Sequence, residues 1–272
     1  MTENQTLLVC LAHPDDEILS SGGTIATLAG RGVRVVLVCA TRGEAGQIAR
    51  PELATPETLG AVREQELLCA ARQLGIAEVI FLDYLDSGMA GSSENERPEA
   101  FINAPAEEII SHLQQIMRRT KPQVVLTFAP YGGYGHPDHI TIHQHTVAAF
   151  DALTADSWQP RRLVYQLIPT FFFEQMRDMI AAHGGDVSDF DLTEHQGKRW
   201  PDDQIHFIVD VTEQVKAKEA AWNCHATQFG PNSRFRRLPR EAMMQLLSKE
   251  YFALAQPEPA PGLLYNDLFA SL

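Results

Sequence analysis

Two segments of the 272-residue chain are rich in histidine and aspartate. They are His13-Pro14-Asp15-Asp16-Glu17 and His136-Pro137-Asp138-His139, which together hold three imidazoles and three aspartates. Zinc in hydrolytic sites is bound by side chains of these types. The two segments therefore predict a metal site that activates water.

The spacing within the segments favours a particular set of ligands. His13 and Asp16 are three residues apart at an expected turn, where one turn of backbone can aim both side chains at one point. His139 would complete a set of two histidines and one carboxylate, which leaves positions open for water and substrate. The rival interpretation is that these polar residues only cap two helices.

The remaining polar residues of the two segments are candidates for proton transfer. Asp15 is adjacent to Asp16 and points elsewhere, so we expect it to be the general base that takes a proton from water. His136 is the expected acid and oxyanion stabiliser, oriented by Asp138. Tyr134 could donate a second hydrogen bond, or only pack over its glycine-rich loop.

Two residues near these segments have more than one interpretation. Glu17 could be a first-turn acid that faces the helix dipole, or could support a ligand histidine from behind. His143 lies four residues after His139, as in another type of zinc site. Ile140 stands where that site would carry its glutamate, so His143 is expected to be a polar helix residue. Four other histidines have no neighbouring ligand types and are expected to be ordinary: His112, His183, His195 and His206.

The elements around these segments predict a Rossmann-like α/β fold. Apolar runs at 7–12 and 124–129 read as buried strands directly before the two motifs. Further strands are expected at 33–40, 78–82, 162–168 and 205–211, and helices at 17–30, 57–74, 106–120 and 213–226. The sheet should be mainly parallel with helices on both faces. Ligands bind such sheets at the carboxyl ends of the strands.

The chain reads as one domain, 1–272, with a core at 1–155 and a C-terminal elaboration at 156–272. The stretch 83–105 is a long loop of the kind that carries function. A polar, glycine-bearing stretch at 183–203 is expected to be an insertion or substrate lid. The sequence does not assign a role to the wider region 156–205.

Composition narrows the classes of partner. A net charge of −13 disfavours nucleic acid and anionic membrane surfaces. No stretch is apolar enough to span a bilayer and the first residues lack a secretion signal, so we expect a cytoplasmic protein.

The basic stretch 234–240 is expected to be a solvated loop or to meet an acidic group. The four cysteines are isolated in sequence, and we expect small core residues and no disulfide.

The motifs resemble those of the LmbE-like (PIG-L) family of zinc-dependent de-N-acetylases. The resemblance rests on Ala12-His13-Pro14-Asp15-Asp16-Glu17 and Gly135-His136-Pro137-Asp138-His139, with supporting segments at 41–46, 62–64, 86–91 and 225–228. Within the family, the runs at 86–91 and 132–139 are most similar to those of deacetylases that act on N-acetylglucosaminyl inositol in mycothiol synthesis. The resemblance implies an amino-sugar conjugate as substrate.

What the resemblance implies can be stated residue by residue. It implies metal ligands at His13, Asp16 and His139, with catalytic roles for Asp15, His136, Asp138 and Tyr134. It also implies sugar contacts by Arg63 and Asp86, although a helix and a long loop are places where surface residues are common. Gln47 departs from the pattern, because the inositol-conjugate enzymes tend to carry an acid there.

Three functions are therefore weighed. The first is a zinc hydrolase that removes the N-acetyl group from an N-acetylglucosamine conjugate, releasing acetate and a free amine. The second is an amidase that cleaves a larger acyl group from a glucosaminyl thiol conjugate. The third is a non-catalytic sugar sensor on the same scaffold. Zinc and iron both stay open as the metal, and so does a homo-oligomer.

Overall fold

The strands of both halves of the chain join one sheet. The computed structural model describes residues 5–153, 158–190, 198–230 and 233–272. Their seven-stranded sheet has the order β3-β2-β1-β4-β5-β7-β6. The strands are β1 (Thr6–Leu11), β2 (Arg34–Cys39), β3 (Glu78–Phe81), β4 (Val124–Phe128), β5 (Arg162–Leu167), β6 (Phe207–Asp210) and β7 (Lys249–Gln256). The strands β1 to β5 are parallel, and β7 runs antiparallel to β5 and β6.

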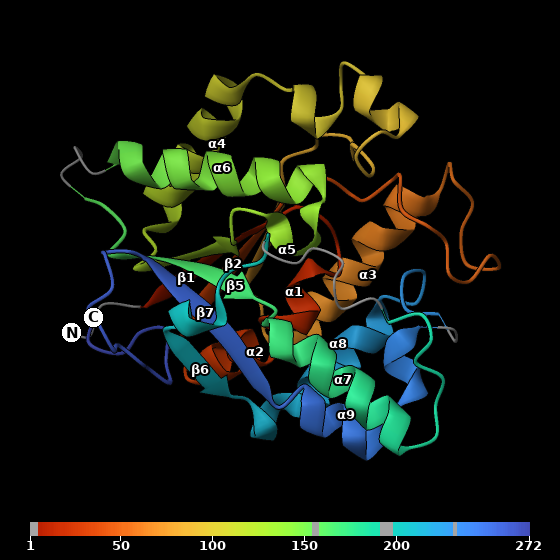
Figure 1. Cartoon of the computed structure of the whole chain (residues 1–272). Coiled ribbons are helices and arrows are strands. Elements are labelled where there is room, and N and C mark those ends of the chain that lie inside the picture. The colour runs from red at the N-terminus through yellow and green to blue at the C-terminus, as the bar shows by residue number, and fades with distance from the viewer. Residues whose placement is uncertain (1–4, 154–157, 191–197, 231–232) are drawn as a thin grey trace.

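Helices cover both faces of the sheet, as expected (Figure 1). In Figure 1, α4 and α6 lie over one face, and α2, α3 and α8 pack together on the other. The helices are α1 (Asp16–Leu19), α2 (Gly22–Gly30), α3 (Leu59–Leu74), α4 (Ala106–Thr120), α5 (Gly132–Gly135), α6 (Pro137–Ala152), α7 (Thr170–Ala182), α8 (Val215–Cys224) and α9 (Arg240–Leu246). Short 3₁₀ turns occupy Ser93–Glu96, Phe101–Asn103, Asp202–Gln204, Thr212–Gln214 and Arg234–Arg237. The α/β class predicted from the sequence is confirmed.

The two motifs meet because of the strand order. Strands β1 and β4 are neighbours, and their following connections lead to opposite sides, to β2 and to β5. Such a switch point leaves a crevice at the carboxyl ends of the strands. His13 follows β1 and His136 follows β4, so both motifs lie at that crevice. Both strands are wholly buried, which fits their apolar sequences.

The helix expected over 17–30 is two helices. The second, α2, begins at Gly22, and free backbone N–H groups of its first turn donate hydrogen bonds to a side chain of strand β7. The carboxylate of Glu250 in β7 accepts hydrogen bonds from Gly23 N and Thr24 N at 2.8 and 2.7 Å. Gly23 also lies against Val211, whose Cβ would be 2.5 Å from an added Cβ. Sequence periodicity cannot show a cap supplied from more than 200 residues away.

Other elements differ from the sequence expectations. Strand β7 and helix α7 lie in the region read as irregular, and the sequence analysis predicted neither. Part of the expected lid, residues 191–197 with His195, lies outside the described residues. The basic stretch does meet acidic groups, since Arg237 pairs with Asp189 and Arg240 with Glu219.

Within the described residues, no helix combines the length and apolarity that a membrane span requires.

The expectation that no disulfide forms is wrong. Cys69 of α3 and Cys224 of α8 are bonded, with an S–S distance of 2.13 Å, and are 155 positions apart in the sequence. Two cysteines so far apart give no local sequence signal, and only the packing of α3 on α8 brings them together. Cys10 and Cys39 are free and buried, as expected.

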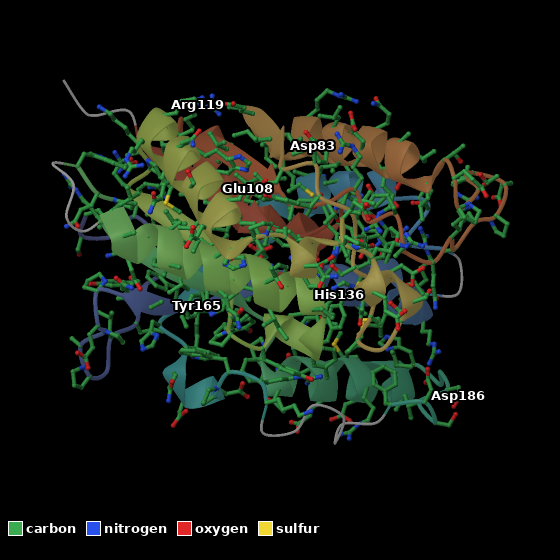
Figure 2. The ribbon with its side chains drawn as sticks, turned by 90° about the horizontal axis from the view of Figure 1, so that it is seen from above. Asp83, Glu108, Arg119, His136, Tyr165 and Asp186 are labelled. Atoms are coloured by element: carbon green, nitrogen blue, oxygen red, sulfur yellow. A yellow bond between two sulfur atoms is a disulfide. The ribbon has the colours of Figure 1, made fainter. Side chains whose placement is uncertain are left out.

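Figure 2 shows where polar side chains lie relative to this core. His136 lies in the interior beside α6, whereas Arg119 and Asp186 lie at the periphery. An ion pair is also deeply buried: Lys218 of α8 donates to Glu250 at 2.6 Å, and both side chains are 1% exposed. This ion pair neutralises the carboxylate that caps α2.

Removing one partner of that buried pair should destabilise the fold strongly. We expect Lys218→Met to lower the free energy of unfolding by about 3–5 kcal/mol, because Glu250 would keep an uncompensated buried charge. Urea unfolding followed by circular dichroism measures this. The control is Arg31→Ala, which removes an exposed ion pair with Asp267 and should cost about 0–1 kcal/mol. Equal losses in the two variants would contradict the expectation.

Candidate metal and catalytic site

Three ligand atoms from the two motifs converge at the crevice. Nε2 of His139 lies 3.2 Å from Nδ1 of His13 and 3.2 Å from Oδ1 of Asp16. Nδ1 of His13 lies 3.6 Å from Oδ2 of Asp16. A tetrahedral ion with bonds of about 2.0–2.1 Å separates its ligands by roughly 3.3–3.4 Å. The two histidine nitrogens therefore have a spacing close to that of ligands on one metal ion, and each of them faces one oxygen of Asp16.

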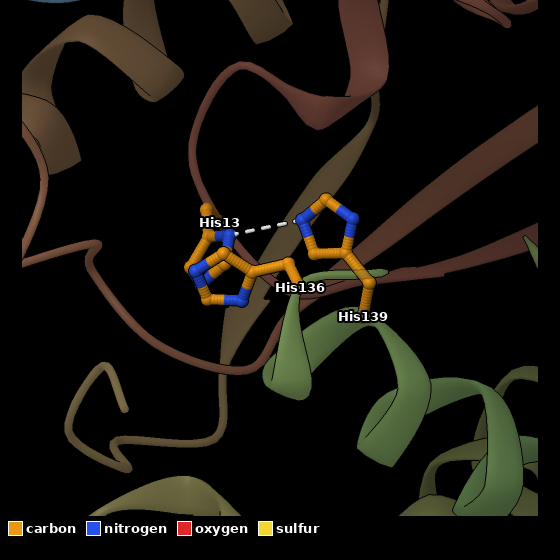
Figure 3. Close-up of side chains that lie close together, drawn as sticks. All are labelled: His13, His136 and His139. Atoms are coloured by element: carbon orange, nitrogen blue, oxygen red, sulfur yellow. Dashed lines mark hydrogen bonds between the residues drawn. The ribbon is translucent and has the colours of Figure 1, made fainter. Parts of the chain in front are cut away.

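The orientation of both rings supports the same conclusion. Nε2 of His13 lies 3.0 Å from the carboxylate of Asp138, and Nδ1 of His139 lies 2.9 Å from the carbonyl of Gly132. Both partners only accept hydrogen bonds, so each ring donates on that side and turns a lone pair inward when neutral. Figure 3 shows these inward nitrogens facing each other. Two lone pairs and a carboxylate at such distances fit a shared cation.

The chain builds this geometry with a close approach at Gly132. Gly132 has a φ of +65°, and a Cβ there would lie 2.5 Å from Cβ of His139. Only glycine avoids both the strain and the collision. Phe128, at the end of β4, stacks on His139 with ring centroids 4.1 Å apart. The ring of His139 is thus fixed by a carbonyl on its edge and an aromatic on its face.

Two other groupings of nearby side chains could also offer three ligand atoms: His13 with His136 and His139, and His13 with Asp86 and Asp138. The second grouping faces the far nitrogen of His13, Nε2. In the first, Nδ1 of His136 already accepts from Asp138 N at 3.2 Å. Asp16 is the nearer anionic ligand for the inward nitrogens, so we favour His13, Asp16 and His139.

The charges around the three ligands favour a cation. Burial opposes charge on His13, but the carboxylates of Asp138, Asp86 and Asp16 raise its pKa well above the usual value. Burial likewise opposes charge on Asp16, and the facing His139 and His13 hold its pKa well below the usual range. The carboxylates around His13 therefore stabilise positive charge at this imidazole, which is the sign of charge that a divalent ion supplies.

Asp15 lies beside the ligands in an unusual backbone conformation. Its φ is 108°, in the left-handed region that favours glycine. Its carboxylate lies 3.3 Å from the guanidinium of Arg63, and its side chain is 22% exposed. Burial raises the pKa of Asp15 to about 6, and Arg63 opposes that rise. A partly exposed carboxylate of raised pKa next to the ligands has the properties of a general base.

His136 differs from the expectation of a protonated acid. Burial and the neighbouring His13 and His139 lower its pKa to about 4. Its Nδ1 accepts from the backbone N–H of Asp138. The proton of the neutral ring therefore resides on Nε2, which makes His136 a neutral hydrogen-bond donor.

The expected partnership of Asp138 with His136 is wrong for the side chain. Oδ2 of Asp138 lies 3.0 Å from Nε2 of His13 and accepts from Ser87 N at 3.0 Å. Only the backbone N–H of Asp138 contacts His136. Asp138 therefore orients the candidate metal ligand His13, the role that sequence analysis offered for Glu17. Glu17 instead accepts from Asp15 N at 2.9 Å and contacts His225.

Arg63 and Asp86 are both 4% exposed, in contrast to the surface placement that is the default for a helix and a long loop. Arg63 donates to the carbonyls of Pro14 and Gly43. Asp86 accepts from Ala45 N and Gly88 N, and neighbouring His13 helps to hold its pKa well below the usual range against the effect of burial. Both residues also line a cavity at the site.

Two cavities meet at the site. A polar one of about 380 Å³ is lined by residues that include Arg63, Asp86, His136 and Gln228. A less polar one of about 210 Å³ is lined by residues that include Leu19, Phe128, Ile168 and Phe229. Asp15 and Tyr134 line both, so the proposed base lies where the cavities join. Tyr134 is 44% exposed and packs edge-on against His139.

His143 lies outside the three-ligand set, as expected, and several residues at the site were given no role by the sequence analysis. His143 is buried and contacts the carbonyl of Phe128, outside the three-ligand set. Sequence reasoning missed the apolar lining of the smaller cavity, since Ile168 and Phe229 belong to no motif. It also assigned no role to His225 and Thr227, although both lie in a segment that supported the family resemblance.

The comparisons with known proteins agree with the motifs. Residues 8–150 match the family model described as PIG-L, GlcNAc-PI de-N-acetylase. A relative from Salinispora arenicola, named 1D-myo-inositol 2-acetamido-2-deoxy-alpha-D-glucopyranoside deacetylase, is 36% identical over 99% of this chain and 92% of its own length. The likeness therefore extends far beyond the two motifs.

Solved structures share the fold at lower identity. The N,N'-diacetylchitobiose deacetylase of Pyrococcus horikoshii has a TM-score of 0.64 and 20% identity, covering 93% of this chain and 84% of its own. A 4-carboxy-2-hydroxymuconate hydratase from Pseudomonas putida has a TM-score of 0.59 and 19% identity, covering 95% and 99%. The fold thus carries more than one chemistry, and the function must be argued from the site.

The contact between Asp138 and His13 gives a testable expectation. We expect Asp138→Ala to weaken zinc binding by about 10–100-fold, because His13 would lose the carboxylate that fixes its tautomer and orientation. Competition with a chromophoric chelator measures the affinity without substrate. Tyr134→Phe, which removes a hydroxyl of the same pocket, is the control and should bind zinc normally. An unchanged affinity in Asp138→Ala would argue against this contact.

Proposed function

The chain belongs to the PIG-L family of GlcNAc-PI de-N-acetylases, and we propose that it is a zinc-dependent hydrolase that removes the N-acetyl group from an N-acetylglucosamine conjugate. The observation that carries this proposal is the position of Asp15. It lies beside three converged ligand atoms and at the junction of a polar and a less polar cavity. An amide bond placed at that junction would have a sugar on one side and an acyl group on the other.

His13, Asp16 and His139 would hold the ion, and zinc bound there would lower the pKa of a water molecule and polarise the amide carbonyl. Asp15 takes the proton of the attacking water on its carboxylate. His136 donates its Nε2–H to the carbonyl oxygen as negative charge develops there, and Tyr134 can add a second donor. Asp15 then returns the proton to the departing nitrogen, so acetate and a free amine leave.

The polar cavity suits a polyhydroxyl ligand. Asp86 and Gln228 offer acceptors and donors on its wall, and Gln47 lines the same space. The relatives act by name on a glucosamine linked to inositol. We infer that the sugar and its hydroxylated aglycone bind here. Arg63 contributes by holding the wall, because its guanidinium already bonds to Pro14 and Gly43.

The less polar cavity suits the acyl group. Its lining by Leu19, Phe128 and Ile168 would bury a short hydrocarbon chain. A cavity of about 210 Å³ exceeds what an acetyl methyl group needs. This observation favours some tolerance of longer acyl groups, the second function weighed above. The sensor hypothesis has no such support, because a base and a neutral donor both line the place where the amide would bind.

Several features remain predictions of this proposal. They are the division of the chain at residue 155, a cytoplasmic location, a homo-oligomer, and the choice of zinc over iron.

A substrate panel with one matched variant tests the proposed activity. Zinc-loaded protein should release amine from N-acetylglucosaminyl inositol, N-acetylglucosaminyl malate or N-acetylglucosamine, with rates that identify the aglycone. Asp15→Asn should lose about 10²–10⁴-fold in kcat, since the amide keeps the shape but cannot accept a proton. Its zinc content, measured by elemental analysis, should stay equal to that of the wild type. Full turnover in this variant would refute the role of Asp15.

The length of the acyl chain tests the assignment of the cavities. We expect N-butyrylglucosamine conjugates to be hydrolysed within about tenfold of the acetyl compound. Ile168→Trp should then lower the butyryl-to-acetyl ratio of kcat/KM by about tenfold or more, because two buried methylenes contribute about 1.6 kcal/mol. Met89→Trp narrows the polar cavity instead and should leave that ratio unchanged. A ratio that responds to Met89 and not to Ile168 would reverse the assignment.

A further inference from the structure

The backbone of Asp15 is held in its left-handed conformation by partners on both sides. Arg63 donates at 2.5 Å to the carbonyl of Pro14, the residue before Asp15. The N–H of Asp15 donates to Oε2 of Glu17 at 2.9 Å. A non-glycine residue with a φ of 108° persists only where its surroundings impose it. These two hydrogen bonds clamp the peptide group that joins Pro14 to Asp15.

Glu17 is itself held by a residue from the far end of the chain. Oε1 of Glu17 lies 2.6 Å from Nε2 of His225, and both side chains are at most 1% exposed. A buried carboxylate with one fixed hydrogen-bond partner has little freedom to move. The position of His225 therefore determines where Glu17 can receive the N–H of Asp15.

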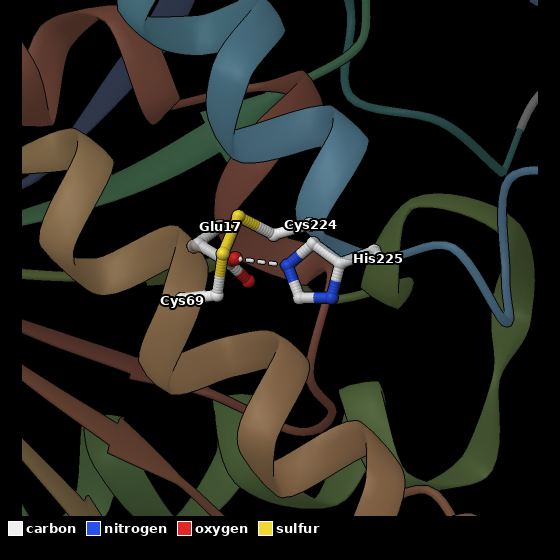
Figure 4. The surroundings of a disulfide bond; sticks show 4 residues. All are labelled: Glu17, Cys69, Cys224 and His225. Atoms are coloured by element: carbon white, nitrogen blue, oxygen red, sulfur yellow. Dashed lines mark hydrogen bonds and ion pairs between the residues drawn. A yellow bond between two sulfur atoms is a disulfide. The ribbon is translucent and has the colours of Figure 1, made fainter.

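His225 is in turn anchored on either side by helix α3. Its neighbour Cys224 is bonded to Cys69 (Figure 4), with Cα atoms 5.8 Å apart. Two residues after His225, Thr227 donates to the carboxylate of Glu66 through its backbone N at 2.7 Å and its hydroxyl at 2.6 Å. Arg63, Glu66 and Cys69 follow one another at intervals of three residues on α3. One face of one helix thus holds both the peptide before Asp15 and the segment around His225.

We propose that Glu17 and His225 are positioning residues for Asp15, and that the Cys69–Cys224 disulfide fixes His225 for this task. The proposal rests on the proposed function, in which Asp15 is the base. It adds that the orientation of the base depends on a chain of contacts from the disulfide through His225 and Glu17 to the Asp15 N–H. Neither positioning residue belongs to the three-ligand set.

Kinetic constants separate positioning from general stability. His225→Ala should lower kcat by about tenfold or more, with KM within about threefold and an unchanged zinc content, because substrate and metal keep their own contacts. The control is Leu113→Ala, a fully buried position on α4 away from the site, which loses stability and should keep kcat. A kcat in His225→Ala that matches Leu113→Ala would overturn the proposal.

The contribution of the disulfide is tested by a mutant cycle. Replacing Cys69 and Cys224 together by serine should lower kcat, whereas Cys10→Ala, at a buried free cysteine, should not. In a Glu17→Gln background the same double replacement should lower kcat by less than about twofold more, since the contact chain is already broken. If the double replacement lowered kcat by the same factor in the Glu17→Gln background as in the wild type, the disulfide would act elsewhere. That result would overturn its part in the proposal.

A readout without substrate keeps this proposal separate from the proposed function. Hydrogen exchange of a peptide spanning 13–18 reports protection of the Asp15 N–H. Exchange there should be faster in His225→Ala and in the double serine variant than in the wild type, and unchanged across 124–128 in β4. A wild type with no deacetylase activity but with this exchange pattern would refute the activity and retain the positioning chain. Unchanged exchange over 13–18 would refute the chain itself.

Discussion

The structure depends most on one electrostatic constraint, the convergence of two imidazole lone pairs and a carboxylate. His13, His139 and Asp16 bring these groups within 3.2–3.6 Å of one another. Without a cation such an arrangement is repulsive or is relieved by protonation. Several contacts of the surrounding structure therefore hold these groups in place. Asp138 and Gly132 fix the ring tautomers, and Phe128 restrains one ring face. The glycine at 132 and the buried Asp138 are both consequences of this constraint.

Helix α3 helps to hold the loop after β1 in one fixed conformation, although the backbone of that loop is strained at Asp15. The loop after β1 carries two proposed metal ligands and the proposed base within four residues, and Asp15 adopts a conformation there that costs of order 1–3 kcal/mol. Arg63 and Glu17 offset that strain through fixed hydrogen bonds. Helix α3 also packs on α8, and His225, directly after α8, contacts Glu17 of this loop. The two halves of the chain are thus joined chemically as well as through the shared sheet.

The sequence predicted what is local and missed what is joined through space. Apolar runs before His13 and His136 fixed the strands, and the switch between β1 and β4 then brought the motifs together. The partner of Asp138 was assigned wrongly, because a neighbour in sequence, His136, seemed nearer than His13 on another strand. The Cys69–Cys224 bond and the Glu250 cap of α2 were missed because they join residues that are far apart in the sequence. Strand β7 escaped notice because it lies in a region without alternating periodicity, and its place in the sheet is set by pairing with β5.

The likeness to a hydratase of the same fold shows which features can distinguish one chemistry from another. The two proteins share the fold at a TM-score of 0.59, so the fold alone does not argue for amide hydrolysis. What argues for it here is the relation between Asp15 and two cavities of different polarity. The proposed base lies at the junction of a polar cavity and a less polar one, an arrangement that would match the two ends of an N-acylated amino sugar. The amide that joins those ends is then the bond nearest to the proton acceptor and the metal ligands.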